Sequence, residues 1–188
     1  MKQTKILRRL ESSLTDGRIV TVVRDQFEAD QIDGFVIALT DDWVVLHALA
    51  DGVHLDDIAM LRLRDVSRIW FRDDDPYHHR AITALNGPVA SFDCAPDVGT
   101  VELLTAAAAT ADIFAIHLEV LEGEPLAIGR LLDHGKKRFT LHYVGRDGEW
   151  ARASERWRYR DVTRIEVGGR YLDALNQFAD PYPDADAS

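Results

Sequence analysis

Cysteine and long apolar runs are scarce in this 188-residue chain, and each shortage excludes a class of protein. Cys94 is the single cysteine, so no disulfide can form within the chain. No stretch reaches the roughly 18 uninterrupted apolar residues of a membrane-spanning helix. Residues 1–13 are charged and lack the apolar centre of a signal peptide. We therefore expect a cytoplasmic protein with no membrane partner.

Motifs with the spacing of catalytic or metal sites are also missing. No HExxH, CxxC, nucleophile-elbow, phosphate-loop or dinucleotide glycine pattern occurs. Two polar sets contain metal-ligand residue types without a spacing that fixes geometry: His78 and His79 beside residues 73–75, and His47 and His54 beside residues 56–57. We predict no catalytic residue, no metal and no cofactor, and we keep a metal-dependent hydrolase at His78 and His79 as a third alternative.

Positive charge is in short supply. The chain holds 22 Lys and Arg against 32 Asp and Glu, a formal net charge of −10. Such a balance argues against nonspecific binding to nucleic acid or to a membrane surface. Residues 1–96 and 97–188 each hold 11 basic and 16 acidic residues, so each half carries −5. The equality fits a duplicated chain.

The chain does contain an internal repeat. Residues 62–69 read Arg-Leu-Arg-Asp-Val-Ser-Arg-Ile, and residues 158–165 read Arg-Tyr-Arg-Asp-Val-Thr-Arg-Ile, identical at six of eight positions. Close similarity at a fixed offset indicates duplication of a whole structural unit. It predicts two small domains, each of a size that buries only a modest core.

The repeat and the composition set the expected domain boundaries. We predict a first domain with its leading helix over residues 1–88, a linker over 89–97, a second domain over 98–179 and a disordered acidic tail over 180–188.

Each copy is expected to be mainly β, with one short helix before its strands and one after them. In the first copy, apolar and β-branched segments bounded by turns predict strands at 19–23, 34–39, 43–48, 58–64 and 67–71. In the second copy, they predict strands at 113–120, 126–132 and 138–143, followed by the repeated motif. Helical patterns lie near 6–14, 77–85, 97–109 and 171–175.

A helix followed by five short strands, with Gly34 leading the second strand and Trp43 leading the third, resembles the Sm-like small β-barrel. Two such copies are similar to a group of uncharacterised bacterial proteins with two tandem barrels. The resemblance implies two five-stranded barrels that associate through edge strands four and five. RNA-binding members of that family place an Asn before the third strand and a basic residue followed by Gly at the last corner. This chain has neither.

The repeated motif is predicted to form a structural corner. Asp65 and Asp161 would accept hydrogen bonds from backbone amides that the corner frees. Four arginines would pair with these aspartates: Arg64, Arg68, Arg160 and Arg164. The alternative is that the arginines of both copies form a paired anion site.

The strongest functional candidate is a set of basic residues in the second copy. It consists of Arg152, Arg156, Arg158, Arg160, Arg164, Lys136 and Lys137. Alternation along a strand would place most of these arginines on one face, with Trp157 and Tyr159 opposite. Arginine binds phosphate through two parallel hydrogen bonds and aromatic rings stack on bases, so the set is compatible with RNA. A solvated face neutralised by nearby acidic residues is the other interpretation.

The corresponding strand of the first copy suggests a different role. Ile58 and Met60 are apolar residues on a strand face that is expected to be exposed to solvent. We therefore assign Ile58, Met60 and Arg62 to an interface. The favoured function is a non-enzymatic interaction or assembly module that binds itself or another protein. An RNA-binding regulator is the alternative, which the net charge opposes.

Overall fold

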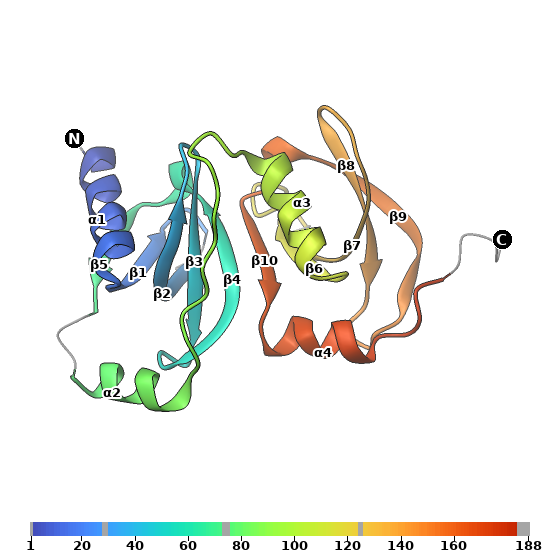
Figure 1. The fold of residues 1–188 in the computed structure, drawn as a ribbon. Coiled ribbons are helices and arrows are strands. Elements are labelled where there is room, and N and C mark those ends of the chain that lie inside the picture. The colour runs from blue at the N-terminus through green and yellow to red at the C-terminus, as the bar shows by residue number, and fades with distance from the viewer. Residues whose placement is uncertain (1, 28–29, 73–75, 124–125, 184–188) are drawn as a thin grey trace. The chain divides into compact units, whose positions relative to one another are not determined.

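The computed structural model describes residues 2–27, 30–72, 76–123 and 126–183. It divides the chain into two compact units, Met1–Gly99 and Thr100–Ser188 (Figure 1). The segment predicted as a free linker therefore belongs to the first unit. No helix in these ranges is long and apolar enough to cross a bilayer.

The first unit contains five strands between two helices. Its elements are α1 (Lys2–Asp16), β1 (Ile19–Arg24), β2 (Asp30–Leu39), β3 (Trp43–Ala50), β4 (His54–Arg62), the 3-10 turn η1 (Leu63–Asp65), β5 (Arg68–Phe71) and α2 (Pro76–Leu85). The strands pair antiparallel in the order β5-β1-β2-β3-β4. This order is open, because β5 and β4 are not hydrogen-bonded to each other in the described chain.

The second unit repeats this succession. Its elements are α3 (Thr100–Thr110), β6 (Phe114–His117), β7 (Leu126–His134), β8 (Arg138–Val144), β9 (Trp150–Arg158), the 3-10 turn η2 (Tyr159–Asp161), β10 (Arg164–Gly168) and α4 (Arg170–Phe178). The antiparallel order is β10-β6-β7-β8-β9. The prediction of a mainly β chain with a helix before and after each set of five strands is confirmed.

Several predicted boundaries are wrong by a few residues. The fourth strand of the first unit ends at Arg62 and not at Arg64, because the chain turns there into η1. The helix expected from Asp97 begins at Thr100. The strand expected over residues 113–120 is the shorter β6, after which the chain turns.

The strand registers show that the two units are copies of one design. Gly34 pairs with Ala48 in the first unit, and Gly129 pairs with Tyr143 in the second. Both β2 and β7 contain a bulge two residues further along. The sequence offset is 95 residues in this hairpin and 96 at the corner, because the irregular stretch of β9 from Trp150 to Ser154 contains one more residue than its counterpart in β4 from Leu55 to Ile58.

The predicted corner is present in both units. The backbone amide of Val66 donates to Leu63 O at 3.1 Å, and that of Val162 donates to Tyr159 O at 3.2 Å. Val66 and Val162 have nearly the same φ and ψ, −75° and 118° against −73° and 124°. Residues of equal type at equal spacing therefore turn the chain in the same way.

The predicted partners of the corner aspartates are only half right. Arg64 Nε lies 3.8 Å from Asp65 Oδ1, and Arg160 Nε lies 3.6 Å from Asp161 Oδ1. Arg68 pairs instead with Asp25, and Arg164 pairs with Glu166. Both are the first residues of strands, which direct them away from the corner. No backbone amide in the described ranges donates to either aspartate.

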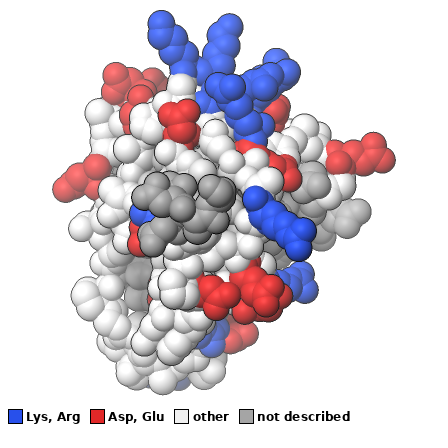
Figure 2. Space-filling model, turned by 90° about the vertical axis from the view of Figure 1, so that its right-hand side faces the viewer, with Lys and Arg blue, Asp and Glu red and all other residues white. Residues whose placement is uncertain are grey.

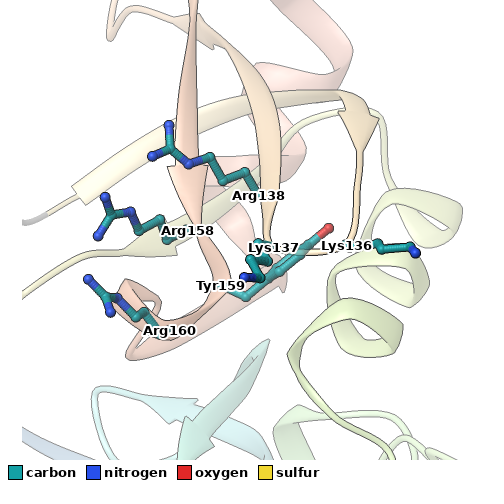
Figure 3. A pocket seen from close by; sticks show the side chains of 6 residues that line it. All are labelled: Lys136, Lys137, Arg138, Arg158, Tyr159 and Arg160. Carbon is teal, nitrogen blue, oxygen red and sulfur yellow. The ribbon is translucent and has the colours of Figure 1, made fainter.

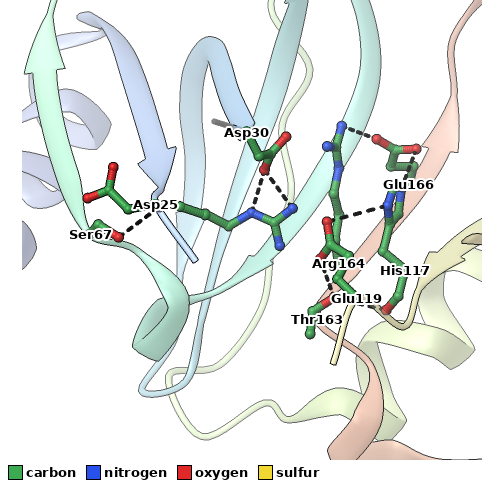
Figure 4. Close-up of polar contacts among 9 residues, drawn as sticks. Asp25, Asp30, Ser67, His117, Glu119, Thr163, Arg164 and Glu166 are labelled. Carbon is green, nitrogen blue, oxygen red and sulfur yellow. Dashed lines mark hydrogen bonds and ion pairs between the residues drawn. The ribbon is translucent and has the colours of Figure 1, made fainter. Parts of the chain in front are cut away.

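Helices cover the sheet of each unit. On α1, Ile6 and Leu10 pack against the core of the first sheet, which includes Val20, Val36 and Leu61. On α4, Leu172 and Leu175 pack against Ile113 and Ala115 at the start of the second sheet. Buried Arg24 is neutralised by Asp30, with its Nε 2.6 Å from Asp30 Oδ2 (Figure 4). This ion pair joins the end of β1 to the start of β2.

The same histidine in each unit anchors the segment that follows the closing helix. The Ala90 amide donates to His47 Nδ1 at 2.9 Å, and the His47 ring also hydrogen-bonds the Asp56 backbone. In the second unit, His142 Nδ1 lies 3.0 Å from Tyr182 Oη, and Nε2 lies 2.7 Å from Ala151 O. The segments after α2 and α4 are therefore the same element of the repeat.

This finding corrects the predicted disordered tail. The Asp180 amide donates to Gly148 O at 3.0 Å, and Trp150 Nε1 donates to Asp180 O at 2.8 Å. Acidic, proline-containing composition predicted disorder because it gave no sign of these long-range partners. Residues 184–188 lie outside the described residues.

Candidate functional site

A basic pocket of about 420 Å³ lies in the second unit, between the β7–β8 turn and the η2 corner. Its lining residues are Lys136, Lys137, Arg138, Arg158, Tyr159 and Arg160 (Figure 3). Five of the six side chains are basic, and no Asp or Glu of the described chain lines the pocket. The guanidinium groups of the three arginines extend to one side of the pocket, and Lys136 lies on the other.

Backbone pairing and one tyrosine position these side chains. Arg138 pairs with Arg158 across β8 and β9, so the two side chains leave the sheet on the same face. Tyr159 stacks on Phe139 with ring centres 5.4 Å apart and donates its hydroxyl to Gly135 O at 2.9 Å. This hydrogen bond ties the corner to the turn. Burial raises the pKa of Tyr159, and the charges of Asp133 and Glu102 raise it further, so the hydroxyl remains a donor at neutral pH.

The local charge is opposite to that of the whole chain. Residues 130–164 contain ten Lys and Arg against five Asp and Glu, although the chain carries −10 overall. Figure 2 shows Lys and Arg side chains gathered at the top of the view. An anion responds to the nearest charges, because salt screens the others over about 8–10 Å. The net charge is therefore a poor guide to binding at this pocket.

The equivalent position in the first unit carries side chains of different charge. Asp41 and Asp42 stand where Lys136 and Lys137 stand in the second unit, and Trp43 stands for Arg138. Arg62, the counterpart of Arg158, is buried with its guanidinium carbon 5.7 Å from the centre of the Trp43 ring. The two units share a backbone and differ in the charge that they present.

The structure gathers most, but not all, of the predicted basic residues. Lys136, Lys137, Arg158 and Arg160 line the basic pocket. Arg156 is exposed on the same face of β9 as Arg158, two residues away.

Two predictions about this set are wrong. Arg164 is largely buried on β10, where it pairs with Glu166, so it does not belong with the others. Tyr159 was expected opposite the arginines but lines the pocket, because the chain leaves the strand at Arg158 and alternation ends there.

Sequence reasoning also missed Arg138. It follows Lys136 and Lys137 directly, and this run of three basic residues was the signal that could have found it.

Arg152 lies in a second pocket, of about 750 Å³, at the far end of β9. Three aromatic rings lie close together there. The ring centres of Trp150 and Tyr182 are 4.8 Å apart, and the ring centre of His142 lies 5.4 Å from that of Trp150 and 5.5 Å from that of Tyr182. The Arg130 guanidinium carbon lies 4.6 Å from the centre of the Tyr182 ring. We call this the aromatic pocket. It exists because His142 and Trp150 hold the segment after α4.

Arg164 belongs to a largely buried polar cluster that also contains His117 and Glu166 (Figure 4). His117 Nε2 lies 3.0 Å from Glu166 Oε2, and Arg164 pairs with the same carboxylate. Burial disfavours ionisation of Glu166, but the hydrogen bond from His117 and the charge of Arg164 outweigh it, so the pKa of Glu166 lies below its usual value. The cluster joins β6 to β10 and is well suited to a structural role.

The candidate metal and thiol residues have ordinary surroundings. His78 Nε2 lies 3.1 Å from an Arg72 nitrogen, and Asp73, Asp74 and Asp75 fall outside the described residues. Within the described ranges, no group of three or more His, Cys, Asp or Glu side chains could hold a metal ion. Burial and the nearby charge of Asp93 raise the pKa of the Cys94 thiol, which disfavours the reactive thiolate.

The predicted interface residues of the first unit are covered to different degrees. Ile58 is half-buried, whereas Met60 and Arg62 are buried. Met60 was expected on a solvent-exposed face and is fully buried, so that expectation is wrong. The assignment of the three residues to an interface stays a prediction.

The chain matches no protein-family model, no curated protein and no solved structure. Its function is therefore argued from the geometry of the basic pocket.

Proposed function

We propose that this chain is a non-enzymatic binding module made of two Sm-like units, and that its second unit binds single-stranded RNA at the basic pocket. The observation that carries the proposal is the convergence of five basic side chains from a turn, a strand end and a corner. The order of one helix and five antiparallel strands in each unit supports the Sm-like assignment.

The chemistry of the pocket suits phosphate groups. Arginine donates two parallel hydrogen bonds to phosphate oxygens, and lysine supplies a point charge. Arg156 and Arg158 are two residues apart on one strand, so their backbone attachments are about 6.6 Å apart. A flexible single strand can present successive phosphates to such a row. Tyr159 is stacked on Phe139 and buried, so it supports the pocket and is not available for stacking on a base.

A matched pair of variants tests this proposal. Arg160 and Arg64 occupy the same corner position, are 72% and 67% exposed, and contact the neighbouring aspartate in the same way. We expect Arg160→Ala to weaken binding of a labelled single-stranded RNA of about 12 nucleotides roughly threefold to tenfold at about 50 mM salt. Arg64→Ala should leave the affinity unchanged. Fluorescence anisotropy measures both.

Two results would contradict the proposal. One is the absence of RNA binding at low salt. The other is equal weakening by Arg64→Ala and Arg160→Ala, since that would place the binding surface outside the basic pocket. Thermal unfolding of both variants provides the control for folding.

Self-association is the second candidate function, and the sheet order favours it. The outer strands of each unit's order have a single neighbour within their unit, such as β5 beside β1 and β9 beside β8, among the described strands. Each of β5 and β9 therefore presents unpaired backbone groups on one side, which can pair with a strand of another copy. The exposed charged residues of β9 oppose such pairing, as charged side chains commonly do at sheet edges.

A further inference from the structure

The basic pocket and the aromatic pocket are joined by one face of the β8–β9 pair. Three cross-strand pairs define this face: Arg138 with Arg158, Thr140 with Arg156, and His142 with Ser154. Residues that pair directly point to the same side of a sheet, and so do alternate residues along a strand. The opposite face is core, where Phe139 and Leu141 are fully buried. We call the outward face the β8–β9 track.

The track runs from one pocket to the other without interruption. Arg138 and Arg158 line the basic pocket, and His142 and Ser154 line the aromatic pocket. Arg156 lies between them and is exposed. The four residue steps from Arg138 to His142 span about 13 Å along β8. Three acidic residues lie beside the track: Asp133, which pairs with Thr140 from β7, and Glu149 and Asp180, which line the aromatic pocket.

In the first unit, an extended stretch of the protein's own chain runs beside the equivalent face. The Ala90 amide donates to His47 within β3, and the Asp41 amide just before β3 donates to Pro96 O at 2.8 Å, so residues 90–96 are held beside the first part of this strand (Figure 1). Burial alternates along this stretch: Ala90, Phe92 and Cys94 are half-buried, and the residues between them are exposed. Alternation of this kind is typical of an extended chain.

The β8–β9 track and the equivalent face of the first unit differ in the polarity of their side chains. The face in the first unit carries Trp43, Val45 and Met60 beside the buried Arg62, a mainly apolar surface. The corresponding positions in the second unit are Arg138, Thr140 and Arg156, and both arginines are exposed. The face that lies beside an extended peptide in one unit is thus cationic in the other, and its two arginines are exposed there.

We propose that the β8–β9 track binds single-stranded RNA in an extended form, with phosphates along Arg158 and Arg156 and a base in the aromatic pocket. This inference rests on the proposed function and adds to it the course of the strand, which runs along β8 and β9 from the basic pocket to the aromatic pocket. The track matches the shortest single-strand sites, about four nucleotides. Tyr182 and Trp150 supply ring surfaces, and Arg152 supplies a further cation at that end.

A length series with three variants tests the inference. Oligonucleotides of about two, four, six and twelve nucleotides are titrated against the whole chain at low salt. For the unmodified chain, we expect a rise in affinity of at least about tenfold between two and six nucleotides. Arg156→Ala and Tyr182→Ala should each remove most of this rise and leave dinucleotide binding nearly unchanged. Arg146→Ala is the control, because Arg146 is exposed in the β8–β9 turn and lines neither pocket.

The outcomes separate this inference from the proposed function. If affinity does not depend on length, or if Arg156→Ala behaves like Arg146→Ala while Arg160→Ala still weakens binding, the track is wrong and the basic pocket stands. If no oligonucleotide binds, both fail. An acidic peptide that binds as tightly as RNA of equal charge would also overturn the assignment of the ligand.

Discussion

Gly129 offers a sharp test of the repeat, because the backbone of β8 leaves no room for a side chain there. A Cβ placed on Gly129 would lie 2.0 Å from His142 O and 2.8 Å from the carbonyl carbon of the same residue. Gly34 has the same position in the first unit, where a Cβ would lie 2.6 Å from His47 O. Both glycines allow two strands to approach closely beside the anchoring histidine.

The expected cost of Gly129→Ala follows from these distances. The obstructing atoms belong to the backbone of a central strand, so they cannot move aside as the end of a side chain could. Overpacking of a well-packed site typically costs 1–3 kcal/mol, and we expect about 3 kcal/mol for Gly129→Ala and about 2 kcal/mol for Gly34→Ala. Such a loss is a large fraction of the roughly 5–15 kcal/mol that stabilises an ordinary domain.

Hydrogen exchange of backbone amides, measured at increasing urea concentrations, would give the loss of unfolding free energy in each unit separately. Gly135→Ala is the control, since its Cβ would meet nothing closer than Arg138 O at 3.6 Å, an ordinary contact. We expect that control to change the free energy of unfolding by less than about 0.5 kcal/mol. Equal stability of Gly129→Ala and Gly135→Ala would refute the close approach of β7 and β8.

Two further predictions concern acid stability and association. The lowered pKa of Glu166 means that its carboxylate stabilises the fold above its usual pKa, and this contribution is lost as pH falls through the lowered value. Glu166→Gln should therefore reduce stability at neutral pH and flatten the acid side of the stability profile, and an unchanged profile would contradict the role of this group. Self-association through β5 and β9 predicts a sedimentation coefficient that rises with chain concentration, whereas a monomer at all concentrations would count against it.

The sequence was most informative where local residue types determine local geometry. The repeated Arg-Asp-Val-x-Arg-Ile motif predicted two corners, and both form with matching hydrogen bonds and dihedral angles. Apolar runs between turns predicted eight strands and the repeat implied two more, and all ten are present in the described chain. Turn chemistry and strand periodicity act over a few residues, so one sequence is enough to read them.

Features that depend on distant partners could not be predicted in this way. The segment after each closing helix looked like a linker or a tail, because its anchors, His47 and His142, lie more than 40 and exactly 40 residues earlier in the chain. Arg164 was predicted to belong to the same basic set as Arg160, but strand pairing places it beside Glu166. The net charge argued against nucleic acid, whereas folding gathers the basic residues of the second unit.

The dependence of RNA affinity on salt tests the central claim most directly. Each phosphate neutralised on a single strand contributes about −0.7 to the slope of log K against log salt concentration, so contact with five basic side chains predicts a slope of about −3.5. Removing Arg158 and Arg160 together should make the slope shallower by about 1.4. A slope near zero, or one that this double variant leaves unchanged, would contradict binding of RNA phosphates at the basic pocket.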